Sequence, residues 1–290
     1  MDLPTFLVQC LNAVQYGLLL FLVASGLTLI FGIMGVINLA HGSFYMLGAY
    51  MAFMLAPLFG EQFLLQLLAG VILAAIFGFL LEWLFFSYLY QRNHLQQVLM
   101  TYSLILVFEE VRSMVVGNDV HGVQVPPWLS GGVALGDLMN YPVYNLFASL
   151  ACLVVAIGLY AVVNKTRLGM MVRAGASNRE MVRVLGIDIR LLYRLVFAAG
   201  VALAALAGMI AAPASSVYPG MGGQILIICF VVVVIGGIGS ISGALIASLL
   251  VGLVDTFGKV FYPQYSGMSV YLLMALILIW KPEGLRSKGY

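Results

Sequence analysis

Apolar runs of about 20 residues, each long enough to cross a bilayer as a helix, recur along the whole of this 290-residue chain. The runs are continuous, as in VILAAIFGFLL at 71–81, whereas the strands of a membrane barrel alternate polar and apolar residues. Charged residues make up 8% of the chain, against roughly 25% in a soluble domain. We therefore predict an all-α, polytopic helical membrane protein that forms a single domain over residues 1–290.

The pattern predicts about eight or nine transmembrane segments, with room for broken helices, because 5–37 is long for one span and 222–238 is short. Gly35–Gly42 and Gly236–Gly243 match at three positions with a constant offset. We interpret the match as a weak internal repeat whose two copies run in the same direction. The predicted segments are 5–37, 43–58, 63–89, 95–116, 142–163, 195–217, 222–238, 241–258 and 266–280.

Basic residues gather in residues 165–194, which hold Lys165, Arg167, Arg173, Arg179, Arg183, Arg190 and Arg194 but only two acids. Cationic loops stay on the cytoplasmic side of a membrane, so we predict that 165–194 is a cytoplasmic loop. Lys281, Arg286 and Lys288 follow the last apolar segment and place the C-terminus on the same side. Counting back from there makes 118–141 extracytoplasmic. The N-terminus is outside if every segment crosses once.

The basic loop contains its own folding signals. Ser177 with Glu180 three residues later predicts a capping box at a helix start, and Gly186 predicts the helix stop. The helix of about eight residues between them is too short to be stable alone. Its apolar face needs a surface to cover it: either a cytoplasmic partner or the lipid headgroups. That face consists of Met181, Val184 and Leu185.

A second polar stretch interrupts the first long apolar segment. Gly35, Asn38, His41 and Gly42 lie where a helix can break. Backbone groups released by a break must be buried in protein or line water. Asn38 and His41 are therefore candidates for the translocation pathway, and the alternative is a polar pair that fixes helix packing.

Several charged residues fall within or near the apolar segments. An intramembrane carboxylate is a candidate proton or sodium relay. Glu109 and Arg112, spaced i, i+3, are expected to neutralise each other. Glu82 and Asp255 lie near segment ends, where we expect them to reach interfacial water. Glu110 is a further carboxylate within the apolar segment 95–116.

The remaining motifs indicate no metal site and no cofactor site. The three cysteines lie in separate apolar runs and are interpreted as buried hydrophobes. The run GGIGSISG lacks the Lys of a nucleotide-binding loop; its glycines Gly236, Gly237, Gly239 and Gly243 favour close helix packing or a turn. Pro126, Pro127 and Trp128 predict a rigid turn with an interfacial aromatic. The loop around that turn either receives a soluble partner or is an ordinary ordered loop.

Short motifs are distributed over nearly the whole chain: Gly26-Leu-Thr-Leu-Ile-Phe-Gly32 with Gly35–Gly42, Phe44–Tyr50, Leu129-Ser-Gly131 with Leu135-Gly136, Thr166-Arg-Leu-Gly169 with Arg173-Ala174 and Gly186-Ile187, Gly236–Gly243, and Pro282-Glu-Gly284-Leu285. In these motifs the chain resembles the integral membrane subunit of ABC importers for branched-chain and other hydrophobic amino acids. Its length is similar to that of the shorter of the two permease types.

The resemblance implies a transporter subunit of a bacterial inner membrane, not an enzyme. It implies a heterodimer with a second permease, two cytoplasmic ATPase subunits and a periplasmic substrate-binding protein. It also implies that 173–187 is the segment received by an ATPase, with Arg173, Ala174, Ser177, Glu180, Met181, Val184, Leu185, Gly186 and Ile187 as coupling residues.

The substrate implied by the resemblance is a branched-chain or other apolar amino acid. Related importers carry urea, short amides or aromatic acids, which are the alternatives within the same class. The alternative from a different class is a secondary transporter driven by ions, which would need an essential intramembrane carboxylate.

Overall fold

The computed structural model describes residues 3–90, 92–134 and 140–286. Part of the predicted 118–141 loop, the Leu135-Gly136 motif and Lys288 lie outside these residues. Within them the chain forms eleven α-helices: α1 (Leu3–Met34), α2 (His41–Phe59), α3 (Phe63–Leu84), α4 (His94–Val116), α5 (Val143–Lys165), α6 (Arg167–Ser177), α7 (Arg179–Val184), α8 (Ile189–Ala211), α9 (Met221–Gly236), α10 (Ile241–Phe261) and α11 (Ser266–Trp280). Two short strands, β1 (Gly132–Ala134) and β2 (Asn140–Pro142), pair antiparallel.

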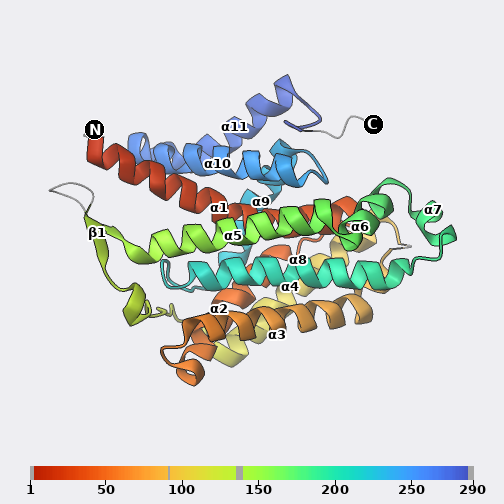
Figure 1. The fold of residues 1–290 in the computed structure, drawn as a ribbon, viewed down its shortest axis with the longest axis horizontal. Helices are drawn as coiled ribbons and strands as arrows, with labels where there is room; N and C mark the ends of the chain where they lie inside the picture. The colour runs from red at the N-terminus through yellow and green to blue at the C-terminus, as the bar shows by residue number, and fades with distance from the viewer. Residues whose placement is uncertain (1–2, 91, 135–139, 287–290) are drawn as a thin grey trace.

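The longer helices form an elongated bundle with two distinct ends (Figure 1). One end, here called the hairpin end, carries β1, β2 and the start of α1. The opposite end, here called the α7 end, carries α6 and α7. The two segments that the charge pattern assigns to opposite sides of a membrane thus lie at opposite ends of the bundle, and α1 starts at the hairpin end.

The nine predicted apolar segments correspond to α1–α5 and α8–α11. Six helices are long and apolar enough to cross a membrane by length and composition, namely α1, α2, α3, α5, α8 and α10, and two shorter apolar helices, α9 and α11, accompany them. α4 carries Glu109, Glu110 and Arg112 in its second half. The prediction of an all-α, polytopic membrane protein is confirmed.

The break expected in segment 5–37 is present near the end of that segment: α1 is a single helix of 32 residues that ends at Met34. The chain is non-helical at residues 35–40, beginning with Gly35 at φ +65°. His41, the first residue of α2, donates a hydrogen bond from Nε2 to the Val23 carbonyl at 2.9 Å. α2 therefore starts beside the middle of α1, about three helical turns before α1 ends.

Residues 35–40 consequently run back into the bundle as non-helical backbone. Such backbone is tolerated at membrane depth only where protein covers it. Val36, Asn38 and Ala40 are all buried, with at most 1% of their surface exposed. The polar stretch that the sequence places here is thus enclosed by the surrounding helices.

The core is built around α1, which packs against α10, α8, α5 and α9. Every residue from Gly17 to Ile30 is buried. A Cβ atom at Gly26 would lie 2.6 Å from the Gly200 carbonyl oxygen of α8, and one at Gly17 would lie 3.0 Å from the Leu249 Cα of α10. These glycines let the backbones of neighbouring helices touch, which is how helices associate in lipid without a hydrophobic driving force between them.

The segment that follows α4 is hydrogen-bonded to the α8–α9 connection at the hairpin end. His121 and Val217 exchange backbone hydrogen bonds of 2.9 and 2.8 Å, which join this segment to the α8–α9 connection. The His121 ring stacks on Phe53 at 4.3 Å between centroids. Trp128, in the predicted turn, is half exposed and packs on Phe147 at 5.6 Å.

Gly26→Leu is expected to lower the thermal unfolding midpoint of the detergent-purified protein, because the new side chain would force α1 and α8 apart. Overpacking of this kind costs about 1–3 kcal/mol or more. Gly158→Leu is the matched control, since Gly158 lies in α5 with no atom within 4 Å of a Cβ placed there. Equal midpoints for the two variants would contradict the close α1–α8 contact.

Candidate functional site

The basic stretch 165–194 folds into α6, α7 and the start of α8. The Thr166 side chain caps α6 by accepting a hydrogen bond from the Gly169 backbone N–H at 3.2 Å. The Arg173 guanidinium donates a hydrogen bond to the Val163 carbonyl in the last turn of α5. α6 is therefore fastened to the helix that precedes it.

The capping box predicted at Ser177 is wrong. Ser177 is the last residue of α6, and the cap of α7 is Asn178. Asn178 has an extended backbone, and its side-chain oxygen accepts a hydrogen bond from the Met181 backbone N–H at 3.0 Å. The Asn178 backbone N–H still bonds to the Ala174 carbonyl, so α6 continues through Ser177, and α7 has six residues instead of about eight.

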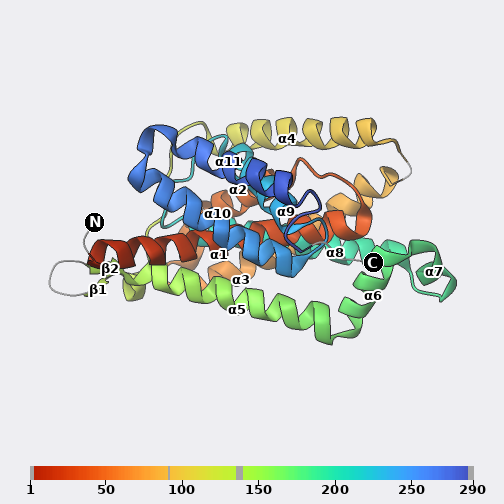
Figure 2. The same ribbon diagram turned by 90° about the horizontal axis from the view of Figure 1, so that it is seen from above.

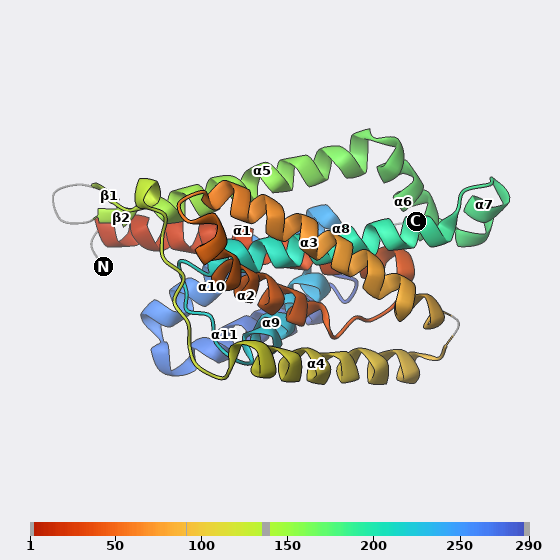
Figure 3. The same ribbon diagram turned by 90° about the horizontal axis from the view of Figure 1, so that it is seen from below.

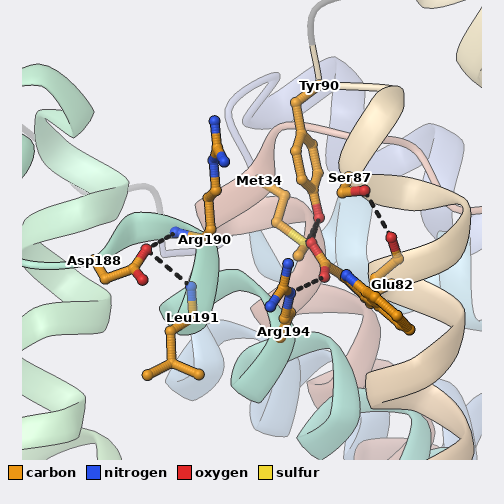
Figure 4. Close-up of polar contacts among 9 residues, drawn as sticks. Met34, Glu82, Ser87, Tyr90, Asp188, Arg190, Leu191 and Arg194 are labelled. Carbon is orange, nitrogen blue, oxygen red and sulfur yellow. Dashed lines mark hydrogen bonds and ion pairs between the residues drawn. The ribbon is translucent and has the colours of Figure 1, made fainter.

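The left-handed stop expected at Gly186 is present, with φ +81°. The Gly186 N–H bonds to the Arg183 carbonyl at 3.1 Å and the Ile187 N–H to the Val182 carbonyl at 3.4 Å, the paired bonds of a Schellman motif. Asp188 then caps α8 by accepting from the Arg190 and Leu191 backbone N–H groups (Figure 4). The connection from α7 into α8 is thus a short turn held by backbone and side-chain hydrogen bonds.

The apolar side chains of the α7 segment point away from the rest of the described chain. Met181, Val184 and Leu185 are 56%, 81% and 71% exposed. Val182 faces the other way and is buried. Of the other predicted coupling residues, Ala174 and Glu180 are exposed and Ile187 is half-buried. The segment therefore presents three large apolar side chains that the described residues leave uncovered.

An ion pair joins α8, the helix that follows α7, to α3. Glu82, near the end of α3, is 1% exposed, and one of its carboxylate oxygens lies 3.3 Å from Arg194 Nε on α8. The Tyr90 hydroxyl, from the α3–α4 connection, donates to the other oxygen at 2.6 Å (Figure 4). Burial and then the Glu82 charge raise the pKa of Tyr90 above its ordinary value, so the phenol keeps the proton that it donates.

Glu82 was expected to reach interfacial water, and that expectation is wrong. A carboxylate near a helix end can reach water only if neighbouring elements leave it uncovered, and here Tyr90, Arg194 and the end of α1 cover it. Asp255 is also nearly buried and pairs with Lys259 at 2.5 Å, although the Lys259 side chain is 61% exposed. The expected Glu109–Arg112 pair is confirmed at 3.1 Å.

Asn38 and His41, the candidate pathway residues, are fully buried. The Asn38 side-chain oxygen accepts from the Ala40 N–H at 3.0 Å. The Asn38 amide nitrogen and His41 Nδ1 are buried without a hydrogen-bond partner among the described residues. Gly42 packs on the backbone of Gly222 at the start of α9 so closely that no Cβ would fit. Neither Asn38 nor His41 lines either of the two cavities described below.

The glycines of GGIGSISG surround the α9–α10 turn. Gly237 and Gly239 have φ of +93° and +77°, which only glycine adopts readily. Gly236 and Gly243 touch through their backbones, where a Cβ on either would overlap the other helix. A Cβ at Gly32 of α1 would lie 2.9 Å from Gly239 Cα. The turn therefore packs directly against the end of α1.

The described residues form a cavity at each end of the bundle. One, of about 360 Å³, is lined by Gln9, Asn12, Asn145, Asp255 and Lys259 among others, at the hairpin end. The other, of about 760 Å³, is lined by Thr28, Arg173, Ser240, Glu283 and Arg286 among others, at the α7 end. No cluster of three or more metal-ligating side chains occurs among the described residues.

Comparison with known proteins identifies this architecture. The family described as branched-chain amino acid transport system / permease component matches residues 9–279. The chain belongs to this permease family. BraD of Pseudomonas aeruginosa, a high-affinity branched-chain amino acid transport system permease protein, is 31% identical over 98% of this chain and 96% of its own length.

Two permease proteins of Escherichia coli K12 from the same kind of transport system are also similar to this permease. LivH is 27% identical over 98% of this chain and 96% of its own length. LivM is 26% identical over 90% of this chain and 66% of its own length. No solved structure matches the permease.

Arg194→Met in this permease is expected to lower its thermal unfolding midpoint in detergent, because Glu82 would remain buried without its cation. Breaking a buried ion pair costs about 3–5 kcal/mol, and the partial exposure of Arg194 favours the lower part of that range. Arg190→Met, one helical turn earlier and exposed, is the matched control and should change little. A second change, Glu82→Gln, should recover part of the loss; no recovery would contradict the ion pair as its cause.

Proposed function

We propose that this permease is the membrane subunit of an ATP-driven importer that passes branched-chain amino acids into the cytoplasm. The observation that carries the proposal is the family match over residues 9–279, together with relatives that cover nearly the whole chain and are named for branched-chain amino acid transport. The chain contributes the multi-pass transmembrane part, and ATP hydrolysis takes place in separate subunits.

The proposed assembly contains a second permease, two cytoplasmic ATPase subunits and a periplasmic substrate-binding protein. The similarity of this chain to both LivH and LivM supports a pair of related permeases. We place the assembly in a bacterial inner membrane with the α7 end in the cytoplasm, because residues 165–194 and the C-terminal segment carry most of the basic residues. The hairpin end and the N-terminus then face outward.

We propose that α7 is the element that docks on an ATPase subunit. Met181, Val184 and Leu185 are all more than half exposed in this chain, and full burial of a large apolar side chain stabilises a contact by about 1.5–3 kcal/mol. The turn through Gly186 and the Asp188 cap connects α7 directly to α8, which packs on α1, α2 and α3. Movement of α7 would therefore reach the core of the bundle.

An ion-coupled transporter is the competing class, and the charge pairing argues against it. Glu82, Glu109 and Asp255 each have a basic partner within 3.3 Å. A proton or sodium relay needs a carboxylate whose charge is available to the ion. In these three residues the charge is already matched by the protein.

The complete complex, reconstituted in proteoliposomes with its binding protein outside, is expected to accumulate leucine, isoleucine or valine only when ATP is present on the ATPase side. Uptake of radiolabelled amino acid measures this directly. Uptake of urea or of an aromatic acid, with no branched-chain amino acid taken up, would overturn the substrate while keeping the class. Uptake driven by an ion gradient without ATP would overturn the class.

Leu185→Glu in the same complex is expected to abolish the stimulation of ATPase activity by loaded binding protein, because the variant would bury a charge in the docking contact. Loss of one buried apolar side chain alone weakens a contact by about tenfold or more. Leu185→Met is the control and should retain stimulation and uptake. Full stimulation and uptake in Leu185→Glu would mean that α7 lies on the lipid surface instead.

A further inference from the structure

The cavity at the α7 end is formed where α1, α5, α6, the α9–α10 turn and the C-terminal segment meet. Its volume, about 760 Å³, is within the range of ligand-binding pockets. In Figure 2 and in Figure 3, α5 runs along the outer edge of the bundle, and α6 leads from its end across the α7 end. The cavity therefore lies at the end of the bundle and beside its outer surface.

The charged side chains that line this cavity leave it positive. Arg173 of α6 and Arg286 of the C-terminal segment stand against one carboxylate, that of Glu283. Neither guanidinium forms an ion pair with a described residue. Arg173 donates one hydrogen bond to the Val163 carbonyl, but a guanidinium has five N–H donors, so others remain for a ligand. The cavity thus offers positive charge to an anion.

The N-terminus of α10 adds to this positive charge. Ile241 and Ser242, the first two residues of α10, both line the cavity. The first N–H groups of a helix have no intrahelical partner and carry partial positive charge, which favours a bound anion. The Ser240 side chain caps α10 by accepting from the Gly243 N–H at 3.1 Å. The cap therefore occupies the third N–H of the helix and leaves the first two for a ligand.

Thr28 of α1 indicates independently that a polar ligand belongs in this cavity. Thr28 lines the cavity and is 1% exposed. Its hydroxyl has no hydrogen-bond partner among the described residues. A buried hydroxyl without a partner is destabilising, and native proteins pair nearly all such groups. An oxygen atom of a ligand in the cavity would accept the missing hydrogen bond.

The rest of the wall is apolar and continues onto the outer surface of α5. Leu29, Ile33 and Val234 line the cavity. Tyr160 of α5 also lines it and is 56% exposed, and Ile157, about one turn before, is 60% exposed. A free phosphate ion makes no use of such a wall, whereas the acyl chains of a lipid would cover it. Basic pockets between membrane-spanning helices on the cytoplasmic side are sites for anionic lipid headgroups.

We propose that this cavity binds a phospholipid of the cytoplasmic leaflet by its headgroup phosphate. The phosphate lies between Arg173, Arg286 and the N-terminus of α10, and the acyl chains lie along α5 from Tyr160. Because two guanidinium groups face one carboxylate, phosphatidylglycerol, which is anionic, should bind better than phosphatidylcholine, which has no net charge. The leaflet rests on the orientation proposed above, and the site itself does not depend on the transported substrate.

A lipid bound in this way would connect elements that are otherwise joined only through the bundle. Arg173 belongs to α6, which leads directly into α7. Arg286 is held to the end of α9 through its backbone N–H, which bonds to the Gly236 carbonyl at 3.3 Å. One phosphate between the two arginines would therefore tie α6 to the α9–α10 turn.

The test uses the permease purified in mild detergent together with the subunits that remain bound to it. Native mass spectrometry counts the phospholipids retained, and titration of the delipidated protein with phosphatidylglycerol gives an apparent dissociation constant. Arg173→Gln and Arg286→Gln should each weaken binding about tenfold, the effect of losing one charge-assisted hydrogen bond. The double variant should retain one lipid fewer than the wild type. Arg190→Gln is the matched control, because Arg190 is an exposed arginine at the start of α8 that lines neither cavity.

Wild-type retention and affinity in the double variant would overturn the assignment. An equal loss in Arg190→Gln would overturn it as well, since general surface charge would then attract the lipid. Arg286→Gln separates binding from folding, because the printed contact of Arg286 with α9 runs through its backbone N–H. The thermal unfolding midpoint of this variant, measured on delipidated protein, should equal that of the wild type.

Thr28→Val and inorganic phosphate test the remaining parts of the proposal. Valine removes the unpaired hydroxyl, so Thr28→Val should not lower the unfolding midpoint of the delipidated protein but should weaken phosphatidylglycerol binding. Inorganic phosphate should not displace the lipid, because it cannot cover the apolar wall. Displacement by inorganic phosphate would mean that the site takes a free anion. That result, or equal binding of phosphatidylcholine, would overturn the proposal of an anionic phospholipid.

Discussion

The close backbone contacts of α1 are the constraint on which the rest of this permease depends. α1 touches α10 at Gly17, α8 at Gly26 and the α9–α10 turn at Gly32. Between helices in lipid, van der Waals contact and hydrogen bonds replace the hydrophobic effect as the source of association. A side chain at any of these three positions would push α1 away from the neighbouring element. Gly17 faces α10, Gly26 faces α8, which continues from α7, and Gly32 faces the α9–α10 turn.

The non-helical segment 35–40 is possible only because the helices packed around α1 also cover this segment. Residues 35–40 fold back beside α1 as non-helical backbone, and the helices around them exclude lipid. His41 is tied to the Val23 carbonyl and Gly42 to the start of α9. The His41 bond thus places the start of α2 beside the middle of α1.

The α7 end combines an exposed apolar surface with a hydrogen-bonded connection to the core. α7 itself is short and its apolar side chains are uncovered, whereas the next helix is capped by Asp188 and held to α3 through Arg194 and Glu82. Because α8 also packs along α1 and α2, a displacement at α7 would be transmitted through α8 to the core of the bundle. That layout suits the docking role proposed for α7.

The sequence by itself determined the fold class, the nine apolar segments, the Gly186 stop and the Glu109–Arg112 pair. Each of these depends on hydrophobicity over a window or on residues within a few positions of one another, so the chain pattern is sufficient. Even local chemistry left one ambiguity: Ser177 and Asn178 are both good caps, and only the continuation of α6 through Ser177 decided for Asn178. The tertiary structure alone decided the partner of Glu82, which is Arg194, more than a hundred positions away. It likewise decided that Gln9, Asn145 and Asp255 line one cavity, because residues on three helices share a site only once glycine contacts have fixed how those helices pack.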